Sequence, residues 1–177
     1  MGKLIATTQA TLDGVIDPVG EWVQPDGDHG QWSFERQSRS AGLVLGRKTY
    51  EGLAAYWPDK TGKWAEMVNA LPKYVGSQTL SGELEWNATL LKGDLETAIP
   101  RLQKEVEGDL FMHGSGEFAY ALAAAGLIDV YEIYLNPLVW GEANLHLLGD
   151  RGTVRMRLED VKRFDSDVVL LTYLPAT

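Results

Sequence analysis

The stretch LVLGRKTY, residues 43–50, joins three consecutive apolar residues to a glycine, two cations and a hydroxyl. A continuous apolar run, rather than an alternating one, is typical of a strand that is covered on both faces in a parallel sheet. The glycine and the polar residues after it predict that this strand turns directly into a helix beside Arg47 and Thr49. Backbone N–H groups and the positive end of the helix dipole would then face outward together, which favours a bound anion. The alternative is that Arg47 and Lys48 only solvate the start of a surface helix.

A second turn of the same kind occurs in LFMHGSGEF, residues 110–118, where a buried strand again passes through glycine into a helix. Two such turns at the carboxyl ends of neighbouring strands would suit a ligand with several phosphates. Gly114, Gly116 and Ala119 also fit the dinucleotide fingerprint G-x-G-x-x-A. A Rossmann domain is a minor alternative, because this turn comes late in the chain and the acidic residues after it begin the following strand. Glycines needed only for a tight helix start are the other alternative.

The rest of the chain alternates strands and helices. Strands are expected at residues 3–8, 42–46, 73–77, 109–113, 128–140, 153–164 and 167–174. Helices are expected at residues 28–40, from about residue 47, and at residues 64–71, 95–106 and 114–126. Asp94 is the expected N-cap of the helix at 95–106, and Pro100 should kink that helix or shift its start. This alternation predicts an α/β fold of three layers, with a mixed, mainly parallel sheet and helices on both of its faces.

The composition predicts a single domain over residues 1–177. Apolar residues make up 45% and charged residues 23% of the chain, and no apolar run approaches the roughly 18 to 20 residues that span a bilayer. The start of the chain lacks the apolar core of a secretory signal, so the expected location is cytoplasmic. The net charge of −9 argues against binding to nucleic acid or to an anionic membrane.

The residue types exclude several kinds of catalytic site. The sequence has no cysteine, which removes disulfides, thiolate metal sites and a cysteine nucleophile. His29, His113 and His146 share no metal-ligand spacing, so no metal site is predicted. We interpret His113, at the end of an expected strand, as a packing or hydrogen-bonding residue rather than a catalyst. The Gly-Ser-Gly sequence at residues 114–116 also lacks the spacing of a nucleophile elbow.

Five segments, taken in order, make the chain resemble the dihydrofolate reductase superfamily. The resemblance is closest to the branch related to the reductase domain of riboflavin biosynthesis, and it covers almost all of the chain. The segments are KLIATTQATLDGVID (3–17), LVLGRKTYEGLAAYWP (43–58), KYVGSQTL (73–80), LFMHGSGEFAYALAAAGLID (110–129) and VRMRLEDVKRFDSDVVLLTYLPA (154–176). Together these segments are far more specific than any one of them alone.

The resemblance implies an eight-stranded mixed sheet and NADPH as hydride donor. It also implies that the two glycine turns hold the phosphates of the cofactor, in agreement with the suitability of cationic helix starts for phosphate. The implied cofactor-binding residues are Gly46, Arg47, Lys48 and Thr49 at the phosphates, Ser77 and Gln78 at the adenosine 2′-phosphate, Gly114, Ser115 and Gly116 along the pyrophosphate, and Thr8, Gln9 and Ile16 near the nicotinamide.

Some residues depart from the pattern of the family. Gly76 stands where the family often has a bulkier apolar residue, and Gln78 where it often has arginine, so one cation at the 2′-phosphate is missing. A folate reductase takes the carboxylate that holds the pterin from a helix start, where Asp26 and Asp28 are the nearby candidates. Asp13 is the other candidate catalytic carboxylate, with a hydrogen bond inside its own turn as the alternative. Folate itself is therefore not the expected substrate.

The predicted function is an NADPH-dependent reductase of a small heterocyclic or carbonyl-type substrate, which water protonates. The substrate would lie between the sheet edge and the loop of residues 13–29, with Trp22 and Trp32 as candidates to cover or stack on it. Packing is the alternative role of both tryptophans. One alternative function is 5-amino-6-(5-phosphoribosylamino)uracil reductase of riboflavin biosynthesis, and its phosphoribosyl group would need a second cationic site. The other is a non-catalytic nucleotide-binding protein.

A homodimer is also expected. The branch that the chain resembles commonly dimerises, and residues 128–140 are apolar on both faces of the expected strand. An exposed strand would rarely carry so much apolar surface.

Overall fold

Eight strands form one sheet through the middle of the molecule in the computed structural model, which describes residues 2–113, 116–141, 145–147 and 153–176. The strands are β1 (Leu4–Ala10), β3 (Gly42–Gly46), β4 (Lys73–Gly76), β5 (Ala88–Leu90), β6 (Leu110–His113), β7 (Val130–Leu135), β9 (Met156–Arg163) and β10 (Val169–Pro175). Their order across the sheet is β5-β4-β3-β6-β1-β7-β10-β9. Pairing is parallel from β5 to β7, whereas β10 runs antiparallel to both β7 and β9. The predicted mixed, mainly parallel sheet is confirmed.

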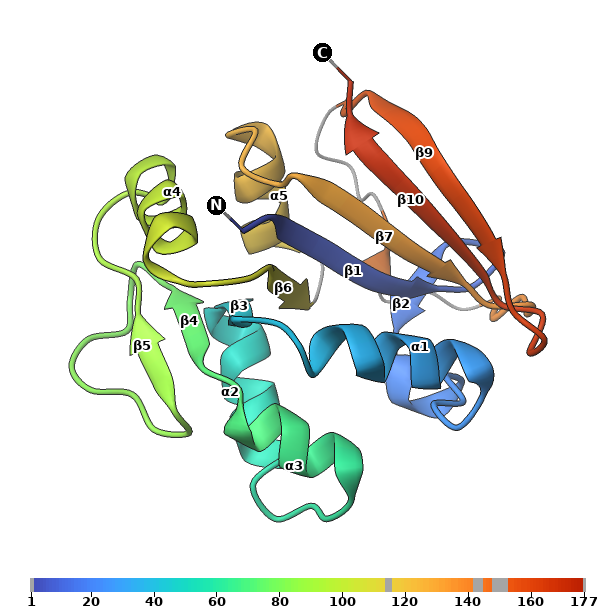
Figure 1. The fold of residues 1–177 in the computed structure, drawn as a ribbon, viewed down its shortest axis with the longest axis horizontal. Coiled ribbons are helices and arrows are strands. Elements are labelled where there is room, and N and C mark those ends of the chain that lie inside the picture. The colour runs from blue at the N-terminus through green and yellow to red at the C-terminus, as the bar shows by residue number, and fades with distance from the viewer. Residues whose placement is uncertain (1, 114–115, 142–144, 148–152, 177) are drawn as a thin grey trace.

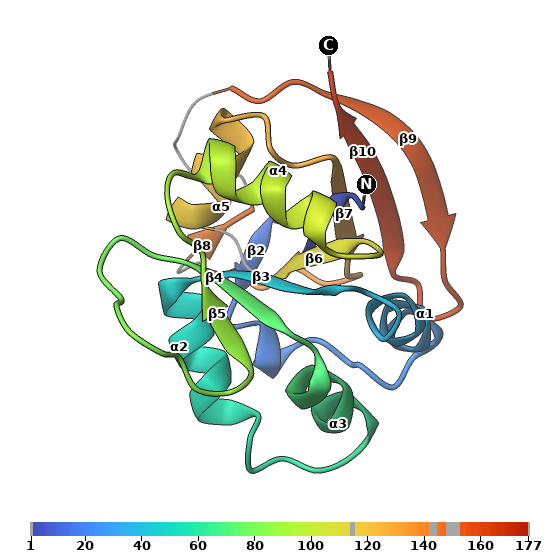
Figure 2. The same cartoon turned by 60° about the vertical axis from the view of Figure 1, so that its left-hand side comes forward.

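Helices cover both faces of this sheet, as Figures 1 and 2 show. One face carries α1 (Asp28–Gln37), α2 (Arg47–Tyr56) and α3 (Lys63–Ala70), and the other carries α4 (Leu95–Glu105) and α5 (Glu117–Ala124). The first group packs into one apolar cluster and the second group into another, with the sheet between them. The expected three-layer α/β fold is therefore confirmed.

Strand β3 shows why the continuous apolar run belongs to a central strand. Leu43 and Leu45 pack into the cluster with α2 and α3, while Val44, between them, packs into the cluster with α4. All three side chains are at most 1% exposed. Because successive side chains of a strand point to opposite faces, only a strand covered on both faces can bury all three.

Helix α4 begins where its predicted cap places it. The Asp94 carboxylate accepts a hydrogen bond from the backbone N–H of Thr97 at 2.8 Å. The helix begins at Leu95 and continues through Pro100 to Glu105, so Pro100 does not shift its start. Pro100 lacks the N–H that would otherwise donate to the carbonyl one turn earlier, and the helix continues without that bond.

Several element boundaries differ from expectation. Strand β7 ends at Leu135 rather than near residue 140, because the Asn136 side chain bonds to the carbonyls of Ala10 and Tyr134 and begins a turn. Helix α1 ends at Gln37, three residues early. Four short elements were not expected because none is long enough to show a periodic pattern. These are β2 (Val15–Asp17), η1 (Val19–Glu21), β5 (Ala88–Leu90) and β8 (Leu145–His146).

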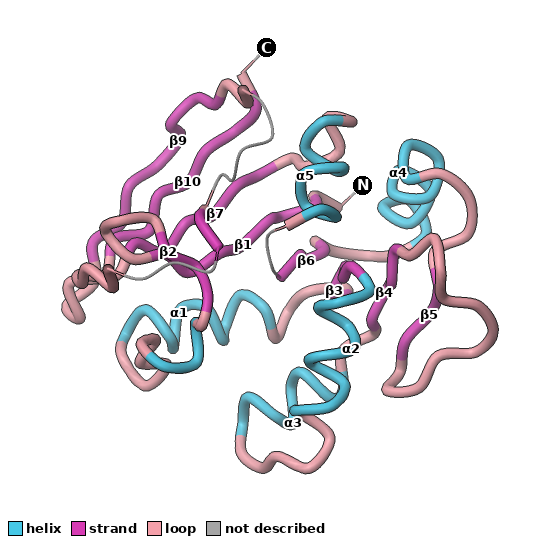
Figure 3. Tube along the Cα trace, turned by 180° about the vertical axis from the view of Figure 1, so that it is seen from behind, coloured by secondary structure: helices cyan, strands magenta, loops and turns pink. Residues whose placement is uncertain are grey.

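Strands β2 and β8 form a separate two-stranded sheet. Strand β2 lies beside the end of β1, as the view from behind in Figure 3 shows. The backbone N–H of Thr11 bonds to the carbonyl of Val15 at 3.0 Å, which folds β2 back toward β1. Among the helices that the structure describes, none is both long enough and apolar enough to cross a membrane.

Candidate functional site

The carboxyl ends of the parallel strands meet along one edge of the sheet. Gly46 at the end of β3 pairs with Gly76 at the end of β4, and His113 at the end of β6 pairs with Thr7 of β1. Ligands of open α/β sheets bind in the crevice outside such strand ends. The segments predicted to hold a cofactor begin at these ends.

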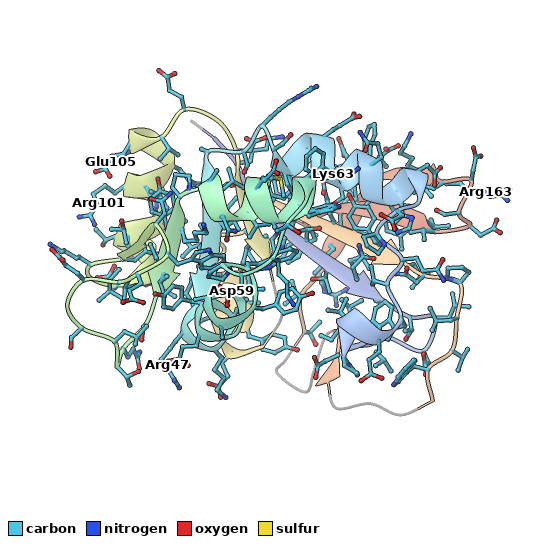
Figure 4. All side chains as sticks on the ribbon, turned by 90° about the horizontal axis from the view of Figure 1, so that it is seen from below. Arg47, Asp59, Lys63, Arg101, Glu105 and Arg163 are labelled. Atoms are coloured by element: carbon cyan, nitrogen blue, oxygen red, sulfur yellow. The ribbon has the colours of Figure 1, made fainter. Side chains whose placement is uncertain are left out.

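The first of these segments is the start of α2. Gly46 is the N-cap residue in an extended conformation, and no side chain caps the first turn. That turn also contains no acidic residue, so its backbone N–H groups and dipole are open to an anion. The guanidinium of Arg47 lies 3.0 Å from the Glu51 carboxylate in an exposed pair within the helix. Figure 4 shows Arg47 at the outer surface, projecting away from the sheet.

The turn after β4 lies beside the start of α2, because Gly76 pairs with Gly46. The Ser77 hydroxyl oxygen accepts hydrogen bonds from the backbone N–H groups of Thr79 and Leu80 at 3.1 and 3.0 Å. These bonds shape the turn, and the Ser77 hydroxyl also lies 3.4 Å from the Thr79 hydroxyl, where either oxygen is able to donate. Gln78 is exposed in the same turn.

The start of α5 is the third segment, and here a glycine is required by the backbone. Gly116 is the N-cap residue with φ of +125°, a conformation that residues with a side chain rarely adopt. Gly114 and Ser115, predicted to lie along the pyrophosphate, fall outside the described residues.

The residues predicted to lie near a nicotinamide are at the end of β1 and in β2. Thr8 and Gln9 are half-buried, and the Gln9 side-chain oxygen accepts a hydrogen bond from Asn136 at 2.9 Å. Ile16 is buried in β2, at 7% exposure. Thr8 and Gln9 are near the carboxyl end of β1, and Ile16 is in the short strand that follows it.

Asp13 holds two loops together. Its carboxylate accepts hydrogen bonds from the Thr11 hydroxyl at 2.5 Å and from the backbone N–H groups of Trp140 and Gly141 at 3.1 and 2.9 Å. The bonds from Thr11 and Gly141 lower the pKa of Asp13 to about 2. This geometry agrees with the turn-internal hydrogen bond considered for Asp13 and extends it to a second loop.

Asp28 lies elsewhere, at the start of α1 against the turn between β9 and β10. Its carboxylate accepts hydrogen bonds from the backbone N–H groups of Asp165 and Ser166 at 2.6 and 3.2 Å. Burial opposes its ionisation, but these hydrogen bonds outweigh burial and lower the pKa of Asp28. Asp13 and Asp28 thus bind different turns, so each has a structural role, and the catalytic role of both stays a prediction.

The two tryptophans predicted to cover a substrate are packed into the protein. Trp22 is 8% exposed, and its indole N–H has no hydrogen-bond partner among the described residues. Trp32 packs edge-to-face on Phe164 at 6.3 Å, with the Lys162 ammonium 4.5 Å from its ring. Trp32 therefore lies between α1 and the β9–β10 hairpin, as the packing alternative expects.

A partly buried ion pair between α1 and β7 was not predicted. Glu132 of β7 is 2% exposed and pairs with Arg36 of α1. Burial raises the pKa of Glu132, and the Arg36 guanidinium opposes that rise. Glu132 alternates with Val130 and Tyr134 on the inward face of its strand. The sequence signal that could have predicted this pair is a charged residue at an inward position of an otherwise apolar strand.

His113 ends a buried hydrogen-bond chain next to the glycine turn. Its Nε2 lies 2.7 Å from the Gln37 side-chain oxygen, and the Gln37 amide donates to the Ser33 hydroxyl at 2.8 Å. Burial lowers the pKa of His113 to about 4, so the imidazole is neutral near pH 7. The interpretation of His113 as a hydrogen-bonding residue is confirmed.

No group of three or more metal-ligating side chains comes together in the part of the chain that the structure describes. A metal-free site was predicted from the histidine spacing.

Comparison with known proteins gives the same fold. Residues 2–170 match the family described as the RibD C-terminal domain. A putative riboflavin biosynthesis protein from Shewanella sp. PV-4 is 22% identical, with a TM-score of 0.73 and 99% of each chain covered. Dihydrofolate reductase from Enterococcus faecalis, solved with NADP(H), is 19% identical, with a TM-score of 0.64 over 99% of this chain and 98% of that one. An uncharacterized Bacillus subtilis protein, YyaP, is 24% identical over 97% of this chain and 94% of its own length.

Proposed function

Because this chain belongs to the RibD C-terminal domain family and is an NAD(P)H-dependent oxidoreductase of dihydrofolate reductase-like fold, we propose that NADPH is its hydride donor. The proposed substrate is a small heterocyclic or carbonyl-type molecule. The E. faecalis dihydrofolate reductase of the same fold was solved with NADP(H), which supports the choice of cofactor.

One observation carries this proposal: the pairing of Gly46 with Gly76 at the strand ends. It sets the uncapped start of α2, with Arg47 and Lys48, beside the Ser77 turn. A phosphate between them would meet backbone N–H groups, a guanidinium and a hydroxyl donor, all of which suit an anion.

The cofactor would lie along the edge of the sheet, with its 2′-phosphate near the end of β4 and its nicotinamide near the end of β1. We assign its 2′-phosphate to Arg47, Ser77 and Gln78, and its pyrophosphate to the starts of α2 and α5. The exposed pair between Arg47 and Glu51 does not oppose this assignment, because exposed ion pairs contribute only about 0.2 to 1 kcal/mol. The nicotinamide would lie at the end of β1, near Thr8, Gln9 and Ile16.

Bound NADPH supplies a hydride for the substrate. The chain itself binds the phosphates, aligns the nicotinamide at the end of β1 and holds the substrate beside the loop of residues 13–29. Asp13 and Asp28 already accept several hydrogen bonds, and His113 is neutral near pH 7. We therefore assign the proton to water rather than to a side chain.

Thermal unfolding with and without cofactor tests the proposed binding. NADPH in large excess over its dissociation constant should stabilise the protein by roughly 2 to 4 kcal/mol and raise the melting temperature. If neither NADPH nor NADH at millimolar concentration shifts the melting temperature, the cofactor assignment is wrong.

A single-turnover experiment separates an enzyme from a protein that only binds the nucleotide. Stoichiometric NADPH is mixed with candidate heterocyclic and carbonyl compounds, and its absorbance is followed over time. Loss of absorbance with one of them identifies the substrate class. Binding of NADPH without any loss, over a broad screen, would favour the non-catalytic alternative.

The uracil reductase of riboflavin biosynthesis remains the second candidate function. Its phosphoribosyl group needs a cationic site of its own, and the structure suggests one location. Lys60 lies in the connection between α2 and α3, and Lys63 begins α3; their ammonium groups are 4.7 and 5.2 Å from the rings of Tyr56 and Phe34. Replacing both lysines by alanine should raise KM for a phosphoribosyl substrate more than for its dephosphorylated form.

We also propose that the protein is a homodimer. Ile133 of β7 pairs with Leu171 of β10, which pairs with Val161 of β9, so these apolar side chains share one sheet face. Helices α4 and α5 pack mainly over β1, β3 and β6 on that side (Figure 1). Val161 is 52% and Leu158 48% exposed, so a second copy would cover apolar surface there.

A further inference from the structure

Phe118, the second residue of α5, lies across the ends of two strands. A Cβ atom added at Gly76 would lie 2.2 Å from Cε2 and 2.6 Å from Cζ of the Phe118 ring. A Cβ atom added at Gly46 would lie 2.7 Å from Cβ and 3.0 Å from Cγ of the same residue. Since real Cβ atoms essentially never approach another atom within 3.0 Å, the phenylalanine occupies the space that both glycines leave.

Space, not backbone conformation, accounts for these two glycines. Gly46 has φ of −77°, which any residue can adopt, and Gly76 is not among the positive-φ glycines of the chain. Gly116 is the opposite case, because its φ is +125° while an added Cβ would meet nothing within 4 Å. The nearest contacts of an alanine at Gly46 or Gly76 would therefore be with Phe118.

The position of Phe118 connects all three segments proposed for the cofactor phosphates. Gly46 directly precedes Arg47 at the start of α2, and Gly76 directly precedes the Ser77 turn. Phe118 itself belongs to the first turn of α5. Its ring packs into the apolar cluster on the α4 and α5 side of the sheet, which holds it in place.

We propose that Phe118 is a positioning residue for the cofactor: its ring sets the spacing between the α2 start and the Ser77 turn. The inference rests on the proposed function, since it assigns NADPH to these turns. A phosphate that binds both turns needs its donors at fixed separation, because hydrogen bonds weaken steeply with poor geometry. The 2′-phosphate depends most on this spacing, because Ser77 and Gln78 directly follow Gly76.

A purely structural role for Phe118 makes a different prediction. A ring that only fills the core would change the melting temperature when it is cut back, and would change NADPH and NADH binding alike. A ring that sets the spacing of the turns would change the preference for NADPH over NADH. Dissociation constants for both cofactors, measured by quenching of tryptophan fluorescence, distinguish the two roles.

The decisive variants add a methyl group at one glycine and then remove the ring. Gly76→Ala meets Cε2, Cζ and Cδ2 of Phe118, and all three atoms are absent after Phe118→Ala. Gly76→Ala alone should weaken NADPH about tenfold, the equivalent of one charge-assisted hydrogen bond, and NADH less. The double variant G76A/F118A should bind NADPH more tightly than Gly76→Ala alone.

Gly46→Ala is the matched control. Its nearest contact is Cβ of Phe118 at 2.7 Å, and this atom remains after Phe118→Ala. The double variant G46A/F118A should therefore bind NADPH no more tightly than Gly46→Ala alone. Rescue at position 76 without rescue at position 46 is the expected pattern.

Three results would contradict the inference. If Gly76→Ala weakens NADPH binding and adding F118A does not restore it, the ring and the turn are not coupled. Variants with altered melting temperatures and an unchanged NADPH-to-NADH ratio would mean that Phe118 only packs. If Gly76→Ala does not fold, Phe118→Leu still tests the inference. This variant should lower the preference for NADPH over NADH on its own, and an unchanged preference would refute the inference. A wild-type protein that binds no NADPH would instead overturn the proposed function.

Discussion

At the scale of single residues, Gly76 and Gln78 explain how this chain departs from its family pattern. Phe118 fills the space beside Gly76, since its ring would lie 2.2 Å from any Cβ at that position. No comparable replacement for the missing arginine at position 78 is visible among the described residues of that turn. Arg47 is therefore the guanidinium left for the 2′-phosphate in our proposal.

The first prediction concerns Arg47. A charge-assisted hydrogen bond of roughly 1.5 to 3 kcal/mol should rest on it, so NADPH should be preferred over NADH by about one to two orders of magnitude. Arg47→Ala should remove most of this preference by weakening NADPH, and Gln78→Arg should increase it. Dissociation constants at fixed ionic strength measure both effects. If Arg47→Ala weakens both cofactors equally, Arg47 binds the shared pyrophosphate instead.

The same measurement on Glu51→Gln provides a control for the ion pair within α2. Glu51 holds the Arg47 guanidinium at 3.0 Å in the free protein. Removing its charge should tighten NADPH slightly and leave NADH unchanged, because an exposed pair is weak. A large gain would mean that this pair competes with the phosphate more strongly than its exposure suggests.

Lys73 carries the second prediction. Its side chain is fully buried, its ammonium donates to the Asn69 carbonyl at 3.0 Å, and it lies 4.0 Å from the Trp86 ring. Burial lowers the pKa of Lys73 from 10.5 to about 8. The unfolded chain therefore binds more protons than the folded one between pH 8 and 10.5, so stability should rise with pH across this window.

Lys73→Met should abolish this rise, because the methionine does not titrate. The measurement is the free energy of unfolding in urea at pH 8 and at pH 10.5 for both proteins. Tyrosines that ionise in the same range are common to both, so the difference between the proteins isolates Lys73. Equal pH dependence in the two proteins would mean that Lys73 keeps an ordinary pKa in the folded state.

At the scale of elements, single carboxylates join segments that are distant in the sequence. Asp13 ties the turn after β1 to residues 140–141, and Asp28 ties the start of α1 to the β9–β10 turn. Both bind backbone N–H groups, which loops would otherwise leave to water. The loop proposed to cover the substrate is thereby held at both of its ends.

The third prediction tests the Asp13 contact by acid titration. The pKa of Asp13 falls from 3.8 to about 2 on folding, so its contribution is present above pH 4 and is lost as the pH falls toward 2. Asp13→Asn should lower the melting temperature at pH 5 and should show less further loss between pH 4 and 2 than the wild type. Calorimetry over this range measures the difference. Parallel curves for the two proteins would show that the carboxylate does not hold the loops.

At the scale of the whole molecule, the sheet is covered unevenly. On one face of the β7–β10 region, Trp32 of α1 packs on Phe164, which follows β9. On the opposite face Val161 and Leu158 are exposed to solvent. Residues 128–140 were described from the sequence as apolar on both faces of a strand. The strand in this stretch, β7, is internal to the sheet, between β1 and β10. The face of β7 that α1 covers is therefore explained within one chain. The opposite face, where Val161 and Leu158 are exposed, supports the proposed dimer.

The fourth prediction follows from that face. Val161→Lys should convert the proposed dimer to a monomer, because a cation would be buried without a partner at the interface. Val139→Lys is the matched control, since Val139 is 68% exposed and lies outside the strands. Light scattering at several concentrations measures the mass of each variant. A wild type that is monomeric at high concentration would remove the dimer from the proposal.

Local patterns were sufficient for the longer elements and for the strand-to-helix turns at which we propose that the cofactor binds. The apolar run of β3, the glycine after it and the cap of Asp94 on Thr97 each involve residues within four positions of one another. Such signals reflect the backbone geometry of strands and helix starts, which neighbouring residues decide by themselves. Short elements such as β5 carry too few residues for the same signals to accumulate.

Partners far apart in the chain were decided only by the tertiary structure. Arg36 and Glu132 are 96 residues apart, and Asp28 meets Asp165 across 137 residues. From the sequence alone, Asp28 was a candidate catalyst and Gly76 an unexplained departure, because neither residue carries a local sign of what it contacts. Packing of α1 on the hairpin and of α5 on the strand ends brings their partners to them. The sequence by itself therefore determined the order of the longer elements and the places where strands turn into helices, while packing decided which side chains contact those turns and loops.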